Sequence, residues 1–447
     1  MFTGKLLVRS VLVALTTSSV GHAQSSPATA PDPTPAAAAP KVTQTAQQNP
    51  AYPAAAGSAA YSFMPAIWPD PEQPRGPINL PELLSSALVQ DGMKRVRAVV
   101  PTSLLNVEVK STQAVLGSGA VNYVGDTSAA GMCYGQAQCH RLTAANGYQP
   151  DVQMCPGANV WGLTFDDGPT DSADNTNSSQ LATADLVAAL AAANNIKATF
   201  FVVGSQSYWH PEILKALYDA GHEIAVHTWT HAALTTLSNE QIVAEVLYTE
   251  AIIVRTLGVR PRFFRPAFGD IDDRGRAILG ALGYTNIIWA DTKDSGDSHG
   301  QTLQQVVDNV KAWFVPQPGF IGLNHNINPA TTEMSIEIVK LIQAVQTVGT
   351  FPLTVQAVGQ CLGVSPYTPV TGASATTSST RMSFSSIVPT TTTAFVDITA
   401  TVPATISTQR PPTSTNRVSV GSAGQPAAVA GLVGVAGVLA VAAGLAL

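Results

Sequence analysis

Between Val160 and Cys361, short apolar runs alternate with longer segments in which apolar side chains recur every three or four residues. A strand that is covered on both faces reads as a continuous apolar run, so the short runs predict buried strands. These are Val160–Phe165, Ala198–Val203, Glu223–Val226, Asn286–Ala290 and Phe320–Leu323. The longer segments predict helices over Leu181–Asn194, Pro211–Ala220, Asn239–Leu257, Arg274–Leu282, Leu303–Phe314 and Glu333–Val348. Strands that alternate with helices predict an α/β fold whose parallel sheet is either open or closed as a barrel.

The rest of the 447-residue chain has other compositions. Residues 24–75 are rich in Ala, Pro, Gln and Ser, which predicts a disordered or loosely extended low-complexity segment. Residues 76–154 are mixed, and we expect them to form an extension that packs on the main domain, with a helix over Leu80–Val89 and a strand over Ala98–Val109. Residues 362–426 are dominated by Ser, Thr, Pro and Val, the composition of an O-glycosylated stalk.

The first 23 residues have the pattern of a secretory signal peptide. Lys5 and Arg9 supply a positive start, the following segment is mostly apolar, and small residues end at Ala23. We therefore expect a secreted protein.

Residues 427–447 form an uncharged run of Ala, Val, Gly and Leu about as long as a membrane span. Small residues including Ser422 precede it, which is typical of a glycosylphosphatidylinositol (GPI) attachment signal. Asn416 and Ser419 are alternative attachment residues, and an ordinary tail anchor is the alternative interpretation. With a GPI anchor, the mature protein would sit on the outer face of the plasma membrane without a membrane helix.

The formal net charge of −6 argues against a nucleic-acid partner, which would need a concentrated basic face. Four cysteines in a secreted chain suggest two disulfides, for which three pairings exist. We favour Cys155–Cys361, which would tie the start of the folded domain to its end, and Cys133–Cys139, which would close a small loop. A zinc–thiolate site is disfavoured by the cysteine spacings. Asn177 begins an Asn-Ser-Ser sequon, the expected N-glycosylation site.

Paired carboxylates follow the first predicted strand. In isolation, Asp166-Asp167-Gly168-Pro169 is turn chemistry. At the tip of a buried strand, however, one carboxylate can bind a cation while the other accepts a proton. His227 and His231 follow the third predicted strand at ligand spacing, in a segment that we expect to be a loop. The strand ends of a parallel α/β fold open on one face, which would bring these side chains together.

Two further candidate residues lie in segments that we expect at the same face of the sheet. Arg265 stands between aromatic residues and prolines, where it either holds a carboxylate or belongs to a rigid loop. His325 ends the last predicted strand and is either a proton donor at the site or a buried structural histidine.

Taken together, these segments resemble the polysaccharide deacetylase family, carbohydrate esterase family 4, and within it the fungal GPI-anchored chitin deacetylases. Thr164–Pro169, His227–His231 and Leu323–His325 match the first, second and fifth family motifs. Arg265–Gly269 resembles the third and Asp291–Asp294 the fourth. The resemblance covers residues 155–361, the expected catalytic domain.

The sequence departs from the family pattern in two of these motifs. Ala267 and Phe268 replace a proline and a tyrosine in the third motif, and Ser295 stands where the fourth motif has tryptophan. The missing tryptophan would have lined the pocket for the acetyl group. Trp289 and Trp229 are candidates to take its place.

The resemblance implies a distorted (β/α) barrel of the polysaccharide deacetylase type with one divalent metal, zinc or cobalt. The metal would be held by Asp167, His227 and His231, and Asp166 would be the general base acting on a water molecule at the metal.

The resemblance also implies roles around the reacting group. The backbone N–H of Phe268 would stabilise the oxyanion, and His325 would protonate the leaving amine. Arg265 would orient Asp166, Asp294 would tune His325, and Leu323 would line the pocket for the acetyl methyl group.

The expected activity is hydrolysis of N-acetyl groups in chitin, giving chitosan and acetate at the cell wall, by a monomeric enzyme. One alternative is a deacetylase for another acetylated glycan, because motifs for the reaction do not name the polymer. Another is a wall protein that binds chitin without cleaving it, which the departures in two motifs permit.

Overall fold

The computed structural model describes residues 46–47, 53–71, 76–113, 122–123, 131–144, 148–171 and 182–370. The chain divides into two compact units, Met1–Thr376 and Thr377–Leu447. The second unit lies wholly outside the described residues, so every element named below belongs to the first.

Five parallel strands form the larger sheet, in the order β11-β10-β8-β7-β6. The strands are β6 (Thr164–Asp166), β7 (Thr199–Val202), β8 (Glu223–Val226), β10 (Phe263–Phe264) and β11 (Thr285–Asn286). The apolar runs read as buried strands are indeed buried: Phe165 pairs with Phe200, which in turn pairs with Ile224. β8 has the predicted bounds. The strand predicted over Asn286–Ala290 is largely wrong, because β11 shares only Asn286 with it, and β10 is too short to show in the apolar pattern.

A second parallel sheet closes the fold. It has the order β12-β5-β13, formed by β12 (Phe320–Ile321), β5 (Val160–Gly162) and β13 (Thr354–Gln356). β5 leads directly into β6, and the chain beyond β12 pairs with both neighbours, through Asp166–His325 and Asp294–Leu323 bridges. The ring of strands is thereby closed, which confirms the expected α/β fold with parallel strands and gives it the form of a distorted barrel.

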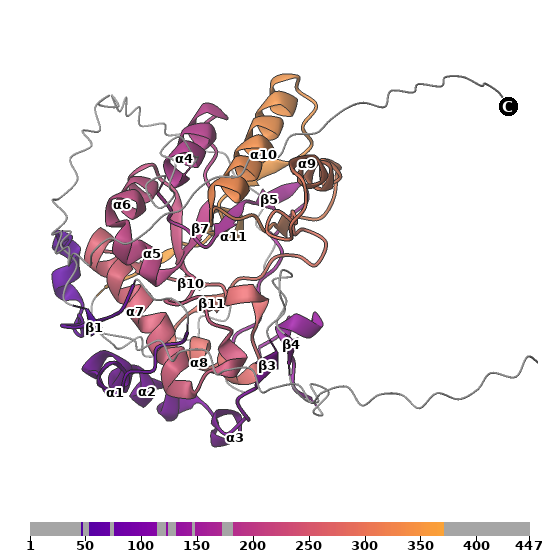
Figure 1. Ribbon diagram of the computed structural model, residues 1–447. Helices are drawn as coiled ribbons and strands as arrows, with labels where there is room; N and C mark the ends of the chain where they lie inside the picture. Colours follow the sequence, from indigo (N-terminus) through magenta and orange to yellow (C-terminus); the bar gives the residue numbers. More distant parts are fainter. Residues whose placement is uncertain are drawn as a thin grey trace, which may run out of the picture. The chain divides into compact units, whose positions relative to one another are not determined.

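Helices surround these strands (Figure 1). They are α4 (Thr183–Ala192), α5 (Gly204–Trp209), α6 (Pro211–Asp219), α7 (Asn239–Leu257), α8 (Asp273–Leu282), α9 (Leu303–Lys311), α10 (Pro329–Thr347) and α11 (Val358–Leu362). The 3-10 turns η4 (Leu234–Thr236) and η5 (Ala267–Gly269) precede α7 and α8. Helix α7 has the predicted bounds because its ends are signalled: the Ser238 side chain caps the first turn, and Gly258 ends it with a φ of 72°.

The N-terminal extension packs on the barrel, as expected, but its elements differ from the prediction. It contains η1 (Ala56–Ala60), β2 (Trp68–Pro69), α1 (Pro81–Leu84), α2 (Ala87–Val99) and α3 (Thr102–Leu105). The strand predicted over Ala98–Val109 is wrong, because α2 runs to Val99 and α3 follows Pro101. A helix is more stable than a strand in this segment because α2 buries a stripe of side chains that includes Val89, Met93 and Val96.

The expectation of disorder is wrong for residues 53–71. Trp68 is completely buried and stacks on Trp229 with ring centroids 6.0 Å apart. The Tyr61 hydroxyl also donates to Glu250 at 2.8 Å, so a few aromatic side chains fix a segment whose average composition is that of an unfolded chain.

Three pairs of short antiparallel strands and two disulfides complete the described part. The pairs join β1 (Ala46–Gln47) to β2, β3 (Thr112–Gln113) to β4 (Asn122–Tyr123), and β9 (Arg260–Pro261) to β14 (Tyr367–Thr368). The disulfides are Cys133–Cys139 and Cys155–Cys361, the two pairings favoured from the sequence. Among the described residues, the helices are too short or too polar to cross a membrane.

Candidate active site

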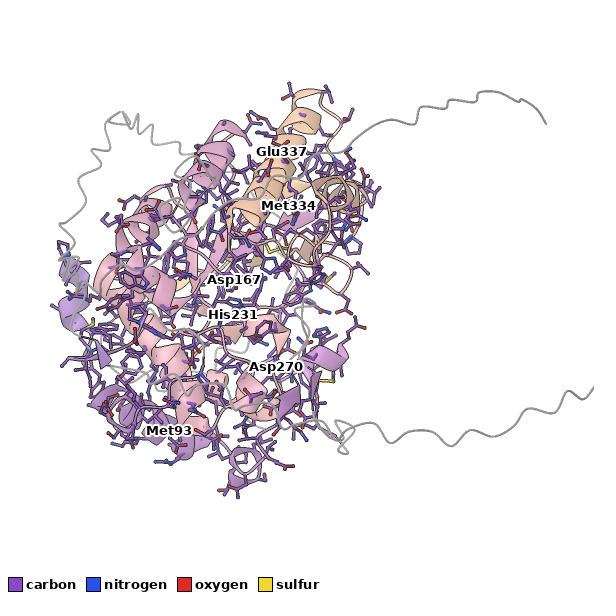
Figure 2. All side chains as sticks on the ribbon, viewed as in Figure 1. Met93, Asp167, His231, Asp270, Met334 and Glu337 are labelled. Carbon is purple, nitrogen blue, oxygen red and sulfur yellow. A yellow bond between two sulfur atoms is a disulfide. The ribbon has the colours of Figure 1, made fainter. Side chains whose placement is uncertain are left out.

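The predicted site residues gather at the carboxyl ends of the barrel strands. Asp166 ends β6, His227 directly follows β8, and Arg265 directly follows β10. His325 lies beyond β12, on the segment that pairs with Asp166. Because these strands are parallel, their ends open on one face, and Asp167 and His231 lie close together there (Figure 2).

Asp167, His227 and His231 each offer one ligand atom, and these atoms all lie within 4.8 Å of one another. Oδ1 of Asp167 is 3.1 Å from Nε2 of His227 and 3.0 Å from Nε2 of His231. Within the described part of the chain, this buried oxygen nevertheless has no hydrogen-bond partner of proper geometry. A buried carboxylate oxygen without a hydrogen bond, beside two imidazole nitrogens, fits a single divalent cation of the zinc type.

The tautomer of His227 is set by the backbone. Nδ1 of His227 donates to the carbonyl oxygen of Arg265 at 2.8 Å, which leaves Nε2 with its lone pair facing Asp167. Burial raises the pKa of Asp167, but the two histidines outweigh it and hold that pKa well below its usual range. Burial lowers the pKa of His231, but Asp167 outweighs this effect and raises it. The carboxylate is therefore ionised and available as a ligand.

The loop between the two histidines is held from behind by Glu245 on α7. This buried carboxylate accepts hydrogen bonds from the backbone N–H groups of Trp229 and Thr230, each at 2.8 Å, and from the Thr230 hydroxyl. It also accepts from the N–H of Ile78 in the N-terminal extension. His231 has a φ of 57°, so this loop holds a conformation that needs such support.

Arg265 fixes Asp166. Nη1 of Arg265 donates to Oδ1 of Asp166 at 2.8 Å and to the Thr164 hydroxyl at 2.7 Å. The guanidinium is completely buried and lies 4.1 Å from the centre of the Phe201 ring. Oδ1 of Asp166 is thus occupied, while Oδ2 lies 3.8 Å from Nε2 of His227, on the side of the candidate metal ligands.

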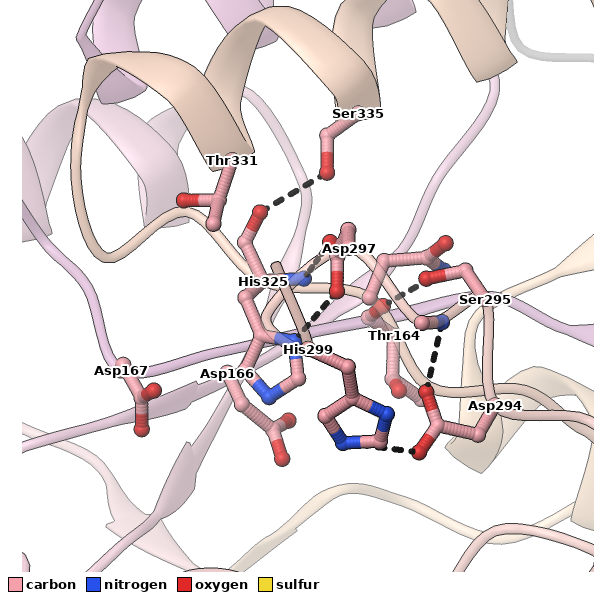
Figure 3. Close-up of polar contacts among 12 residues, drawn as sticks. Thr164, Asp166, Asp167, Asp294, Ser295, Asp297, His299, His325, Thr331 and Ser335 are labelled. Atoms are coloured by element: carbon pink, nitrogen blue, oxygen red, sulfur yellow. Dashed lines mark hydrogen bonds and ion pairs between the residues drawn. The ribbon is translucent and has the colours of Figure 1, made fainter. Parts of the chain in front are cut away.

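His325 is paired with Asp297 rather than with Asp294. Nδ1 of His325 lies 2.6 Å from Oδ1 of Asp297, and the backbone N–H of His325 donates to Oδ2 at 2.7 Å. Burial lowers the pKa of His325, but Asp297 and then the carboxylates of Asp167 and Asp166 raise it to about 10. In Figure 3, the other edge of the imidazole faces Asp166, so a protonated Nε2 would point toward the same site.

Comparison with known proteins agrees with this geometry. Residues 153–287 match the family model for polysaccharide deacetylase. This part of the chain is therefore similar to the polysaccharide deacetylase family. Chitin deacetylase 1 of Cryptococcus neoformans var. grubii is 36% identical over 256 residues, which cover 54% of this chain and 51% of that protein.

Two further proteins are similar to parts of the chain. Chitin deacetylase 2 of Cryptococcus neoformans var. neoformans is 40% identical over 178 residues, covering 39% of this chain and 36% of that protein. The chain thus spans about half, or less, of the length of these relatives. The solved peptidoglycan deacetylase PdaC from Bacillus subtilis is 28% identical, with 46% of this chain and 91% of that chain covered and a TM-score of 0.38.

At the candidate site, the contacts of the fourth-motif residues differ from expectation. Asp294 contacts the N–H of Gly296 at 2.8 Å, and its Oδ2 lies 3.7 Å from Nε2 of the exposed His299 (Figure 3). The proposed tuning of His325 by Asp294 is therefore wrong, because a turn at Gly296, where φ is 79°, carries Asp297 to that place instead. Asp297 was missed because it lies beyond the motif.

The substituted third motif forms the turn η5. Phe268 is partly exposed, and its ring lies 4.4 Å from the His231 ring. Trp289 lies near this turn and 5.7 Å from the Arg265 guanidinium, whereas Trp229 is buried against Trp68 in the extension. Of the two tryptophans considered as replacements, Trp289 thus lies beside the third motif, whereas the ring of Trp229, which belongs to the second motif, packs against the extension.

Leu323 is buried, and Ser295 is completely buried at the position of the family tryptophan. Their backbones pair, since the N–H of Ser295 donates to the carbonyl of Leu323 at 3.1 Å. The predicted glycosylation site Asn177 and the predicted attachment residues Ser419 and Ser422 lie outside the described residues.

Proposed function

We propose that the protein hydrolyses the N-acetyl groups of N-acetylglucosamine units in chitin, giving chitosan and acetate, with one divalent metal, zinc or cobalt. The observation that supports this most is the placement of Asp166 beside Asp167, His227 and His231, with one oxygen held by Arg265. The names of the Cryptococcus relatives support chitin as the substrate.

Asp167, His227 and His231 would hold the metal. When bound, a divalent cation would supply Lewis acidity to a water molecule and to the acetamide oxygen. The ion is expected to be zinc or cobalt because two imidazoles and one carboxylate form a borderline donor set.

Asp166 is placed to accept the proton of the attacking water. Its Oδ1 is occupied by Arg265, so Oδ2 is the oxygen left to take the proton. The water oxygen bonds to the amide carbonyl carbon, and the backbone N–H of Phe268 would donate to the developing oxyanion.

His325 completes the reaction. The carbon–nitrogen bond breaks, and the leaving nitrogen takes the proton from Nε2 of His325, producing the free amine and acetate. The pKa of about 10 keeps the ring protonated at neutral pH, and Asp297 holds it in orientation.

The test is acetate release from N-acetylglucosamine oligomers by the wild-type protein and by Asp166→Asn, both loaded with zinc. We expect release by the wild type and a loss of turnover in the variant, with one metal per chain retained in both. Release from acetylated xylan or peptidoglycan but not from chitin oligomers would favour another glycan. Metal loss in Asp166→Asn would assign Asp166 to the ligand set instead.

We also propose that the protein is secreted and GPI-anchored at the cell wall side of the plasma membrane, as a monomer. This proposal is supported by the composition of residues 1–23 and of residues 421–447. Truncation after Gln425 should release the protein to the medium, and retention of the truncated protein on cells would contradict the anchor.

A further inference from the structure

A small loop of the N-terminal extension lies against the turn that carries Phe268. The loop is closed by the Cys133–Cys139 disulfide and contains the 3-10 turn η2 (Gly135–Ala137). The side-chain Nε2 of Gln136 donates a hydrogen bond to the carbonyl oxygen of Phe268. The backbone N–H of Gly135 donates to the carbonyl of Ile271 at 2.8 Å. Residues more than 130 positions apart are therefore joined across the edge of the site.

The fit between this loop and the turn is close on both sides. A Cβ atom at Gly135 would lie 2.2 Å from the carbonyl oxygen of Gly269, so only glycine allows the loop to approach. A Cβ atom at Gly269 itself would lie 2.8 Å from Trp289. The turn is thus in close contact with both Trp289 and the disulfide-closed loop.

The turn needs this support because of its backbone conformation. Phe268 has a φ of 61°, in the left-handed region that is unfavourable for a residue with a bulky side chain. Such conformations persist when the surrounding structure holds them, and they concentrate at functional sites. The bond from Gln136 acts on the carbonyl of this same residue.

The loop itself is anchored to the barrel by buried charges. Arg276 of α8 donates to the carbonyl oxygens of Cys133, at 2.6 Å, and Cys139, at 3.1 Å. The same guanidinium is paired with the buried Asp151 at 2.9 Å. Next to the disulfide, Nε2 of His140 lies 2.8 Å from Oδ1 of Asp291, in the fourth motif. The loop is therefore a fixed part of the barrel surface at the site.

We propose that this loop positions the main chain of Phe268 for catalysis, and that Gln136 is the positioning residue through which it acts. The inference rests on the proposed function, in which the N–H of Phe268 donates to the oxyanion. The carbonyl and the N–H of Phe268 lie in neighbouring peptide groups that meet at its Cα, so by holding the carbonyl Gln136 restrains the backbone dihedrals that direct the N–H, without touching the substrate. The N-terminal extension then contributes directly to the active site of the deacetylase domain.

The test compares Gln136→Leu with the wild type in the zinc-loaded full chain. Leucine keeps the size of the side chain but removes the donor to Phe268. Because oxyanion donors act in the transition state, we expect kcat on N-acetylglucosamine oligomers to fall roughly 10-fold, with KM, metal content and Tm unchanged. Hydrogen exchange measured on the peptide covering residues 263–272 should become faster. Gly135→Ala, which pushes against Gly269, should lower kcat further.

Gln138→Asn is the matched control, because Gln138 is exposed on the same loop and asparagine tolerates its φ of 54°. It should behave as the wild type. Unchanged kcat and unchanged exchange in Gln136→Leu would overturn the inference while leaving deacetylation intact. If the wild type released no acetate, the proposed function would fail, and the exchange measurement would still decide whether the loop holds the turn.

Discussion

Replacing Asp297 by asparagine removes the charge that keeps His325 protonated. In the structure, the pKa of His325 is raised from 6.5 to about 10, even though burial acts to lower it. At about 1.36 kcal/mol per pH unit, this rise corresponds to roughly 5 kcal/mol in favour of the protonated ring. Without the carboxylate of Asp297, burial loses its main opponent, and we expect the pKa to fall toward its ordinary value of 6.5, while Asp167 and Asp166 still act to raise it.

The consequence is a shift of the alkaline limb of the pH–rate profile. A general acid must be protonated, so activity is retained below its pKa and lost as pH rises through it. At pH 9, a ring with a pKa of about 10 is mostly protonated, whereas one with a pKa of 6.5 is protonated to roughly 0.3%, which predicts a loss of about 300-fold. At pH 7 the loss is only about fourfold. A bound cation lowers the pKa in both proteins, so the quantity to compare is the separation of the two limbs.

The assay is kcat for acetate release between pH 5 and 10, at saturating oligomer and zinc. Asp308→Asn is the control, because it removes an exposed carboxylate on α9 and should leave the profile unchanged. We expect the alkaline limb of Asp297→Asn to move by more than about two pH units to lower pH. Superimposed limbs for wild type and Asp297→Asn would refute the assignment of His325 as the acid that Asp297 tunes.

Three other substitutions test the supports of the site. Arg265→Gln should cost roughly 3–5 kcal/mol of unfolding free energy in denaturant titrations, because it leaves the buried Asp166 unpaired; a loss below about 1 kcal/mol would contradict this. Glu245→Gln should weaken zinc binding roughly 10-fold, measured in competition with a chelator, because it disturbs the loop before His231. Unchanged affinity would show that the loop keeps its conformation without Glu245. Replacing Cys155 and Cys361 together by serine opens a link across 206 residues and should lower stability by about 3–5 kcal/mol; an unchanged melting temperature would contradict that.

The parts of the fold that could be predicted are those whose signals are local. Helix α7 carries an apolar stripe and capping residues at both ends, and β8 is a continuous apolar run, so their bounds were predictable. Helix α2 overlaps the strand predicted over Ala98–Val109 only at its exposed end, Ala98 and Val99, and the stripe that makes it a helix, with Val89, Met93 and Val96 buried, lies before that end. The two-residue strand β10 exists only through its pairing with β8 and β11.

The site shows the same division. Asp166, Asp167, His227 and His231 stand in compact motifs next to strands, and the structure brings them together. Asp297 depends on a turn at Gly296, and Gln136 depends on how a distant loop folds back on the barrel. Neither contact leaves a periodic or motif signal in the sequence, because both are created by tertiary packing. Both contacts are recognised only from the interatomic distances in the folded structure.

We propose that one metal at Asp167, His227 and His231 is required for deacetylation. The most direct measurement strips the protein with chelator and then titrates zinc while following acetate release from N-acetylglucosamine oligomers. The account predicts that activity disappears on stripping, returns in full at one zinc per chain, and does not return in His227→Ala. Full activity of the stripped protein, or of His227→Ala, would contradict it.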